Sequence, residues 1–87
     1  MDLGLAGANV VIAGGTKGMG LAAAECFAAD GANVAVLARR RDALDAALAS
    51  LGALGSPDPL AIETDLRDAS SIDAAFTEIG KRWGGID

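Results

Sequence analysis

Three glycines at the spacing G-x-x-x-G-x-G mark the segment best suited to chemistry. They are Gly14, Gly18 and Gly20, and they follow an apolar run at residues 10–12. Such a turn, placed between a strand and a helix, presents bare backbone N–H groups and the positive end of the helix dipole to a phosphate. We therefore interpret residues 14–20 as a phosphate-binding turn.

Each glycine of this turn has its own expected role. Gly14 allows a sharp exit from the strand, Gly18 lets the backbone approach a pyrophosphate, and Gly20 allows the helix to pack closely on the strand. The Met19 N–H is expected to donate to phosphate oxygens. A P-loop is excluded because Lys17 precedes a glycine, and the commoner G-x-G-x-x-G fingerprint is absent. By themselves the glycines also fit a turn without a ligand.

A basic cluster, Ala38-Arg39-Arg40-Arg41, stands about twenty residues after the glycine turn. An NAD-binding chain usually carries an acid here, which binds the ribose 2′-hydroxyl and repels a 2′-phosphate. Ala38 and Arg39 do the opposite, because a guanidinium binds phosphate and stacks on adenine. Lys17 adds a second positive charge. The pattern predicts NADP(H) as the cofactor, although three arginines also suit a solvated helix start.

A third loop follows the third expected strand and contains Asp65 and Leu66. Asp65 is placed to accept a hydrogen bond from the adenine amino group, with Leu66 giving a backbone contact, but an ordinary loop aspartate is equally consistent. The full set of expected cofactor-binding residues is Gly14, Gly15, Thr16, Lys17, Gly18, Met19, Gly20, Ala38, Arg39, Arg40, Asp65 and Leu66. No catalytic residue and no metal ligand is expected in the chain.

Short apolar runs that alternate with helical patterns must position these residues. Strands are expected at Asn9–Ala13, Asn33–Ala38 and Leu60–Thr64, and helices at Met19–Asp30, at Asp42–Leu51 and from Ser70 to Trp83. The alternation predicts an α/β fold of the Rossmann type, a doubly wound parallel sheet of which this chain holds the first βαβαβα half. Without a fourth strand, residues 10–12 become an unpaired apolar edge.

Several finer expectations concern single positions. Gly52 is expected to end the second helix, and Ser70 is expected to cap the third in a capping box with Asp73. Cys26 and Phe76 are expected to be buried on the apolar faces of their helices. Trp83, which continues the same stripe as Phe76, is expected to belong to the core rather than to stack on a ligand.

Composition limits the possible functions. The chain has 87 residues and a hydrophobic content of 52%, which indicate at most one small globular domain, and we expect residues 1–87 to be the N-terminal dinucleotide-binding part of a single Rossmann domain. The net charge of −5 argues against a nucleic-acid partner. The single cysteine and the absence of histidine exclude an internal disulfide and make a zinc site implausible. The chain has neither a signal-peptide start nor an apolar run long enough for a membrane span, so we expect a cytoplasmic protein.

The motifs together resemble those of the short-chain dehydrogenase/reductase family. The family fingerprint Thr-Gly-x-x-x-Gly-x-Gly is matched at residues 13–20, with Ala13 in place of the threonine. Other family motifs appear as Gly31-Ala32-Asn33-Val34, Asp65-Leu66 and Gly84-Gly85-Ile86-Asp87. In NADP-preferring members a basic residue precedes the second glycine and an arginine follows the second strand, as Lys17 and Arg39 do here.

The resemblance implies an NADP(H)-dependent oxidoreductase of small carbonyl or alcohol substrates that forms a homo-oligomer, a dimer or tetramer. The family's catalytic serine and Tyr-x-x-x-Lys would lie beyond Asp87, and the chain contains no tyrosine. We therefore expect these residues to be the cofactor-binding portion of a longer enzyme and to be inactive alone. The alternatives are a non-catalytic nucleotide-binding sensor or interaction module, and a fold remnant without a ligand.

Overall fold

The computed structural model describes residues 6–14, 16 and 18–84. Strands and helices alternate along the chain in the order β1 (Asn9–Ala13), α1 (Gly18–Ala29), β2 (Asn33–Ala38), α2 (Arg41–Leu54), β3 (Leu60–Glu63) and α3 (Ala69–Trp83). This order confirms the expected α/β class. No helix within the described ranges has the length and apolar content of a membrane span.

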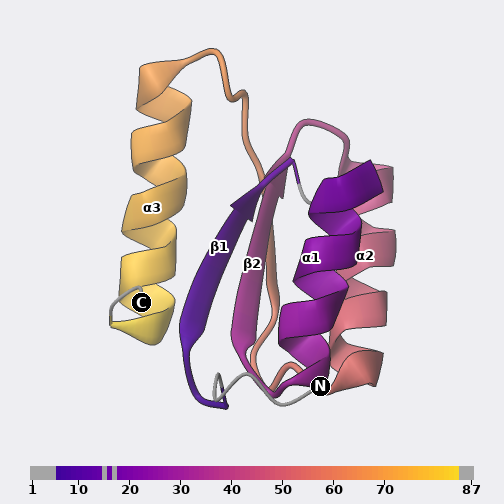
Figure 1. Cartoon of the computed structure of the whole chain (residues 1–87). Helices are drawn as coiled ribbons and strands as arrows, with labels where there is room; N and C mark the ends of the chain where they lie inside the picture. Colours follow the sequence, from indigo (N-terminus) through magenta and orange to yellow (C-terminus); the bar gives the residue numbers. More distant parts are fainter. Residues whose placement is uncertain (1–5, 15, 17, 85–87) are drawn as a thin grey trace.

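The three strands form one parallel sheet in the order β1-β2-β3. In its register Val10 lies opposite Val34, and Leu37 lies opposite Ile62. Helices α1 and α2 lie side by side on one face of the sheet, and α3 covers the other face (Figure 1). Among the described residues β1 pairs with β2 alone, so the expectation that β1 forms a sheet edge is confirmed.

Burial of β2 on both faces creates the core. Val34 and Val36 pack among the buried residues of α1 and α2, while Ala35 and Leu37 pack against α3. Alternation with a period of two produces this division, because successive side chains of a strand point to opposite faces. The apolar run at residues 34–37 is therefore what a parallel strand covered by helices on both faces requires.

Helix α2 is longer than expected. It continues through Gly52 to Leu54 and ends at Gly55, whose φ is 124°. The Ser56 N–H donates to the Leu51 carbonyl at 3.1 Å, which closes the last turn. One glycine inside a helix costs only about 1 kcal/mol, and the fully buried Leu51 side chain offsets that loss. Gly52 was therefore wrongly expected to end this helix.

Helix α3 begins with a different cap from the expected one. The Asp68 carboxylate accepts a hydrogen bond from the Ser70 N–H at 3.0 Å, so Asp68 and not Ser70 is the N-cap. Asp73 is exposed, and the expected capping box is wrong. Phe76 is 41% exposed and also contradicts the expectation, whereas Trp83 packs against the core cluster beneath α3 as expected.

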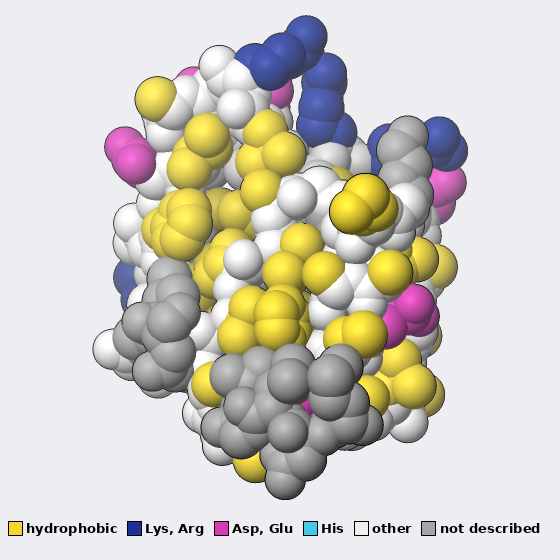
Figure 2. Space-filling model, viewed as in Figure 1, with side chains coloured by type: hydrophobic (Ala, Val, Ile, Leu, Met, Phe, Trp, Pro, Cys, Tyr) yellow, Lys and Arg dark blue, Asp and Glu magenta, His cyan; other side chains and the backbone are white. Residues whose placement is uncertain are grey.

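Helix α1 buries a different face from the expected one. Its buried residues are Ala24 and Ala28, and Cys26 is exposed. Glu25 is the only charged residue of this helix, so the helix has no polar face that contrasts with an apolar face. The sequence of α1 therefore does not show which face is buried. Figure 2 shows apolar side chains on the molecular surface over β1, between α1 and α3.

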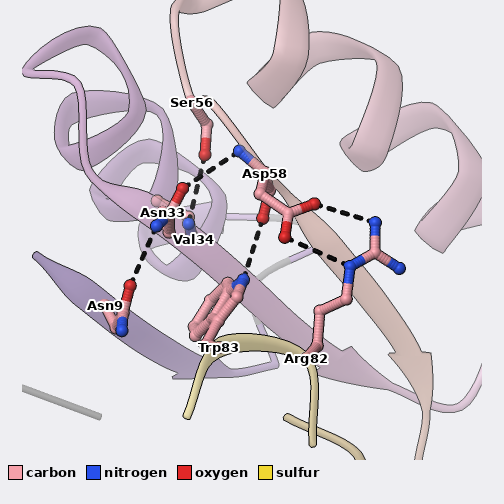
Figure 3. A network of polar contacts seen from close by, with 7 residues as sticks. All are labelled: Asn9, Asn33, Val34, Ser56, Asp58, Arg82 and Trp83. Atoms are coloured by element: carbon pink, nitrogen blue, oxygen red, sulfur yellow. Dashed lines mark hydrogen bonds and ion pairs between the residues drawn. The ribbon is translucent and has the colours of Figure 1, made fainter. Parts of the chain in front are cut away.

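A polar network joins the amino ends of the strands to the end of α3 (Figure 3). Asn33 Nδ2 donates to Asn9 Oδ1 at 2.9 Å, and the Asp58 N–H donates to Asn33 Oδ1 at 3.0 Å. Arg82 donates to the Asp58 carboxylate from Nη2 at 2.9 Å and from Nε at 3.1 Å. Trp83 Nε1 donates to the Asp58 carbonyl at 3.2 Å. These contacts stabilise the sheet at the amino ends of its strands. They do not occupy the carboxyl ends, where ligands of parallel sheets bind.

Candidate cofactor-binding site

A cavity of about 360 Å³ opens at the carboxyl ends of the strands. Its walls come from the loops after all three strands and from the start of α2: Gly14, Thr16, Ala38, Arg39, Arg40, Ala43 and Leu66. Ligands of open parallel sheets bind in the crevice outside the carboxyl ends of the strands. Figure 2 shows basic side chains gathered at this end of the molecule. Three loops that are distant in sequence therefore converge here, as the sequence predicts.

A second cavity of about 290 Å³ adjoins the first and shares Arg39 with it. Its other lining residues are Glu63, Thr64, Asp65 and Ser71. Asp65 thus lies beside Arg39 but in a different hollow from Leu66. The two residues of this loop therefore line different cavities that have Arg39 in common.

The glycine turn has the backbone conformation that its residue types allow. Gly14 has φ 72° and Gly18 has φ 61°, both in the left-handed region that favours glycine. The Gly14 N–H donates to the Leu37 carbonyl at 2.7 Å and extends the β1–β2 ladder. A Cβ at Gly14 or Gly18 meets nothing within 4 Å, so the space in front of the turn is open. Gly15 and Lys17 lie outside the described residues.

Met19 and Gly20 lie in the first turn of α1 and do not line either cavity. The Met19 side chain is 91% exposed, so only its backbone N–H, as expected from the sequence, is available for a phosphate at the helix start. The first turn of α1 carries no acidic side chain that would repel an anion there. The packing role expected of Gly20 stays a prediction.

The three adjacent arginines differ in their partners. Arg40 forms an ion pair with Asp42 at 2.9 Å, and Arg41 forms one with Asp45 at 3.6 Å. The Arg39 guanidinium forms no ion pair or hydrogen bond with the residues that the structure describes. Among the residues that the structure describes, Arg39 is therefore the cation at the cavities that is available for an anionic ligand.

Asp65 closes a turn at the edge of its cavity. Its Oδ1 accepts hydrogen bonds from the Arg67 N–H at 3.0 Å and from Arg67 Nε at 3.3 Å. These two donors, with a smaller contribution from the charge of Arg39, lower the pKa of the Asp65 carboxyl. The loop role of Asp65 is thus present in the structure. Its expected contact with adenine stays a prediction.

Four residues at the cavities were missed by the sequence analysis: Ala43, Glu63, Thr64 and Ser71. Ala43 is in the first turn of α2, and its small side chain leaves the larger cavity open. Thr64 is buried, and its N–H donates to the Ala38 carbonyl at 2.7 Å. Ser71 Oγ accepts the Asp65 N–H at 2.9 Å. Their positions beside predicted strand ends and helix starts were the only available signal.

Comparisons with known proteins agree with this geometry. The sequence model of the short chain dehydrogenase family matches residues 8–87. Sorbitol dehydrogenase of Cereibacter sphaeroides is 37% identical over 83 residues, which cover 95% of this chain and 31% of that protein.

Solved structures show the same likeness. L-Sorbose reductase from Gluconobacter frateurii, complexed with NADPH and L-sorbose, matches with a TM-score of 0.93 and 36% identity, over 100% of this chain and 33% of that chain. A short chain dehydrogenase from Burkholderia cenocepacia in complex with NADP matches with a TM-score of 0.88 and 33% identity, over 95% and 34% of the two chains. The chain spans about one third of the length of these relatives.

Proposed function

Because the chain belongs to the short-chain dehydrogenase family, we propose that it forms the adenosine side of the cofactor site of an NADP(H)-dependent oxidoreductase. Bound NADP(H) supplies the hydride chemistry with a carbonyl or alcohol substrate. The part of this chain is to bind and orient the cofactor, since it contains no tyrosine to act as the family's acid or base. A homo-oligomeric state and a cytoplasmic location belong to the same proposal.

The Arg39 guanidinium, which has no ion pair or hydrogen bond among the described residues, is the observation that carries the choice of NADP(H). It lies on the wall shared by both cavities, directly after β2, while its two neighbours are paired with carboxylates. A guanidinium in this place favours a 2′-phosphate, and Ala38 lacks the carboxylate that would repel one. The NADPH and NADP complexes of the two structural relatives support the same choice.

The other residues of the site are expected to bind the remaining parts of the cofactor. The start of α1 at Gly18 offers backbone N–H groups to the pyrophosphate, and the turn at Gly14 leaves open space in front of them. Thr16, on the wall of the larger cavity, adds a hydroxyl on the same side as Arg39. Leu66 and Asp65 border the two hollows in which adenine would lie. Lys17 adds charge from within the turn.

Arg39→Ala tests this proposal by titration of the purified chain with NADPH and with NADH. Wild type is expected to bind NADPH more tightly, and the variant is expected to lose about 1.5–3 kcal/mol of NADPH binding, tenfold or more in Kd, with NADH binding unchanged. Arg41→Ala is the matched control, because Arg41 is ion-paired and does not line the cavity. Equal affinities of wild type for the two cofactors would refute the proposal.

A further inference from the structure

Of the two arginines on the wall of the larger cavity, one is held by a carboxylate. Arg40 Nη2 lies 2.9 Å from Asp42 Oδ2, and Arg40 Nε donates to Asp42 Oδ1 at 3.3 Å. Two parallel contacts of this kind are the geometry in which a guanidinium also binds a phosphate. The Asp42 carboxylate thus occupies the face of Arg40 that a phosphate would use.

A second group on the cavity wall also favours the charged form of Asp42. Asp42 stands in the first turn of α2, whose N-cap residue, Arg40, provides no side-chain cap. The Ala43 N–H, which follows Asp42 directly in the helix, contributes to lowering the pKa of the Asp42 carboxyl. Both Arg40 and Ala43 line the larger cavity. Together with the Arg40 guanidinium, this N–H lowers the pKa of Asp42, so the group is an anion at neutral pH.

We propose that Asp42 is a positioning residue that competes with the 2′-phosphate of the cofactor for Arg40, and so sets how strongly the site prefers phosphorylated adenosine. This inference rests on the proposed function. Arg39 then provides the contact that is always available, and Arg40 provides a second contact only after it leaves Asp42. Asp42 thereby limits the preference for a 2′-phosphate that Arg39 and Arg40 would otherwise give together.

The exposure of the pair limits the size of this effect. The Arg40 and Asp42 side chains are 77% and 71% exposed, so water and salt screen their attraction. A phosphate that carries nearly two charges attracts Arg40 more strongly than one carboxylate does. Arg40 is therefore expected to change partner on binding, and the competition is expected to weaken phosphate binding by about two- to fivefold.

Binding of adenosine 2′,5′-bisphosphate and of 5′-AMP to the full chain tests the proposal, because the two probes differ only in the 2′-phosphate. Asp42→Asn is expected to tighten binding of the bisphosphate about two- to fivefold and to leave 5′-AMP unchanged. Asp45→Asn is the matched control, since it removes the same charge one turn further along α2 from a pair with Arg41. It is expected to change neither affinity.

The Arg40→Gln background shows whether the effect passes through Arg40. In that background Asp42→Asn is expected to give no gain, and Arg40→Gln itself should weaken bisphosphate binding more in the Asp42→Asn protein than in wild type. Thermal melts report the folding of each variant. Asp42→Ser, which keeps an acceptor for the helix N–H groups, replaces Asp42→Asn if that variant melts at a lower temperature.

Each result decides between the two proposals. If wild type does not prefer the bisphosphate over 5′-AMP, the proposed function itself fails. If wild type prefers the bisphosphate but Asp42→Asn gives no gain, the competition proposed for Asp42 fails alone. The competition proposed for Asp42 also fails if Asp45→Asn tightens bisphosphate binding as much as Asp42→Asn does. It fails as well if Asp42→Asn still tightens bisphosphate binding in the Arg40→Gln background.

Discussion

Replacing Ser56 by alanine removes a hydrogen bond from the start of the central strand. Ser56 is 5% exposed, and its Oγ accepts the N–H of the fully buried Val34 at 3.1 Å. Strand β3 begins only at Leu60, opposite Ala35, so no strand residue pairs with Val34 on this side. The Ser56 hydroxyl therefore takes the place of a strand partner, and Ser56→Ala leaves the Val34 N–H buried without an acceptor.

The expected loss follows from that unsatisfied donor. A buried N–H without a partner costs about 1–3 kcal/mol, which is a large part of the roughly 5 kcal/mol that a small domain has available. Each kcal/mol corresponds to about 4–8 °C in a chain of this size. Ser56→Ala is therefore expected to lower Tm by roughly 4 °C or more, and to lower the urea midpoint without a change in the m-value.

Two further variants make the reasoning refutable. Ser56→Thr keeps the hydroxyl and is expected to retain most of the stability. Ser70→Ala removes an exposed hydroxyl that donates to Asp68 at 2.8 Å, and it is expected to stay within about 0.5 kcal/mol of wild type. If Ser56→Ala loses no more than Ser70→Ala, the hydroxyl of Ser56 does not support β2, and the account of this strand is wrong.

Two other predictions concern the site and its charges. Gly18→Ala is expected to abolish NADPH binding, because Gly18 starts α1 in the phosphate-binding turn. Gly84→Ala is the control: its φ of 81° is comparable to the 61° of Gly18, but it follows the end of α3, so it is expected to lower stability by about 1–2 kcal/mol and leave binding intact. A folded Gly18→Ala protein that binds NADPH as wild type does contradicts the phosphate role of the turn. The Arg67 donors lower the pKa of Asp65 in the folded chain. Asp65 therefore stabilises the fold at a pH above its unfolded pKa, and this contribution is lost as the pH falls through its folded pKa. Tm is therefore expected to decrease below about pH 4, and Asp65→Asn is expected to make that decrease smaller. If the Tm of the variant falls with pH as steeply as that of wild type, Asp65 does not contribute to the loss of stability in acid.

Sequence alone predicted the strands well, because their signals are local. β1 and β2 were expected at the residues where the structure has them, since each is a short apolar run bounded by turn residues. β3 was expected one residue longer, and Thr64 still donates to the Ala38 carbonyl beyond its end. The convergence of the loops also followed, because parallel strands bring their carboxyl ends to the same edge of a sheet.

The partners of the arginines could not all be predicted. Arg41 and Asp45 stand at the i and i+4 positions of a helix, which is a spacing that sequence can interpret. Arg40 and Asp42 are two residues apart, and they meet only because Arg40 is extended at the N-cap while Asp42 is already helical. Which arginine remains unpaired therefore depends on where α2 begins, and helix ends are the least predictable feature of a sequence.

The order β1-β2-β3 has a consequence for how the chain is made. Each strand pairs with the one synthesised just before it. The hydrogen bonds of Asn33 with Asn9 and with Asp58 join residues only 24 and 25 positions apart in the sequence. A ribosome takes about one to five seconds to add that many residues, whereas closing such loops takes far less than a millisecond. β1 and β2 therefore have time to meet before β3 is synthesised, and we expect the three described strands to assemble in the order of their synthesis.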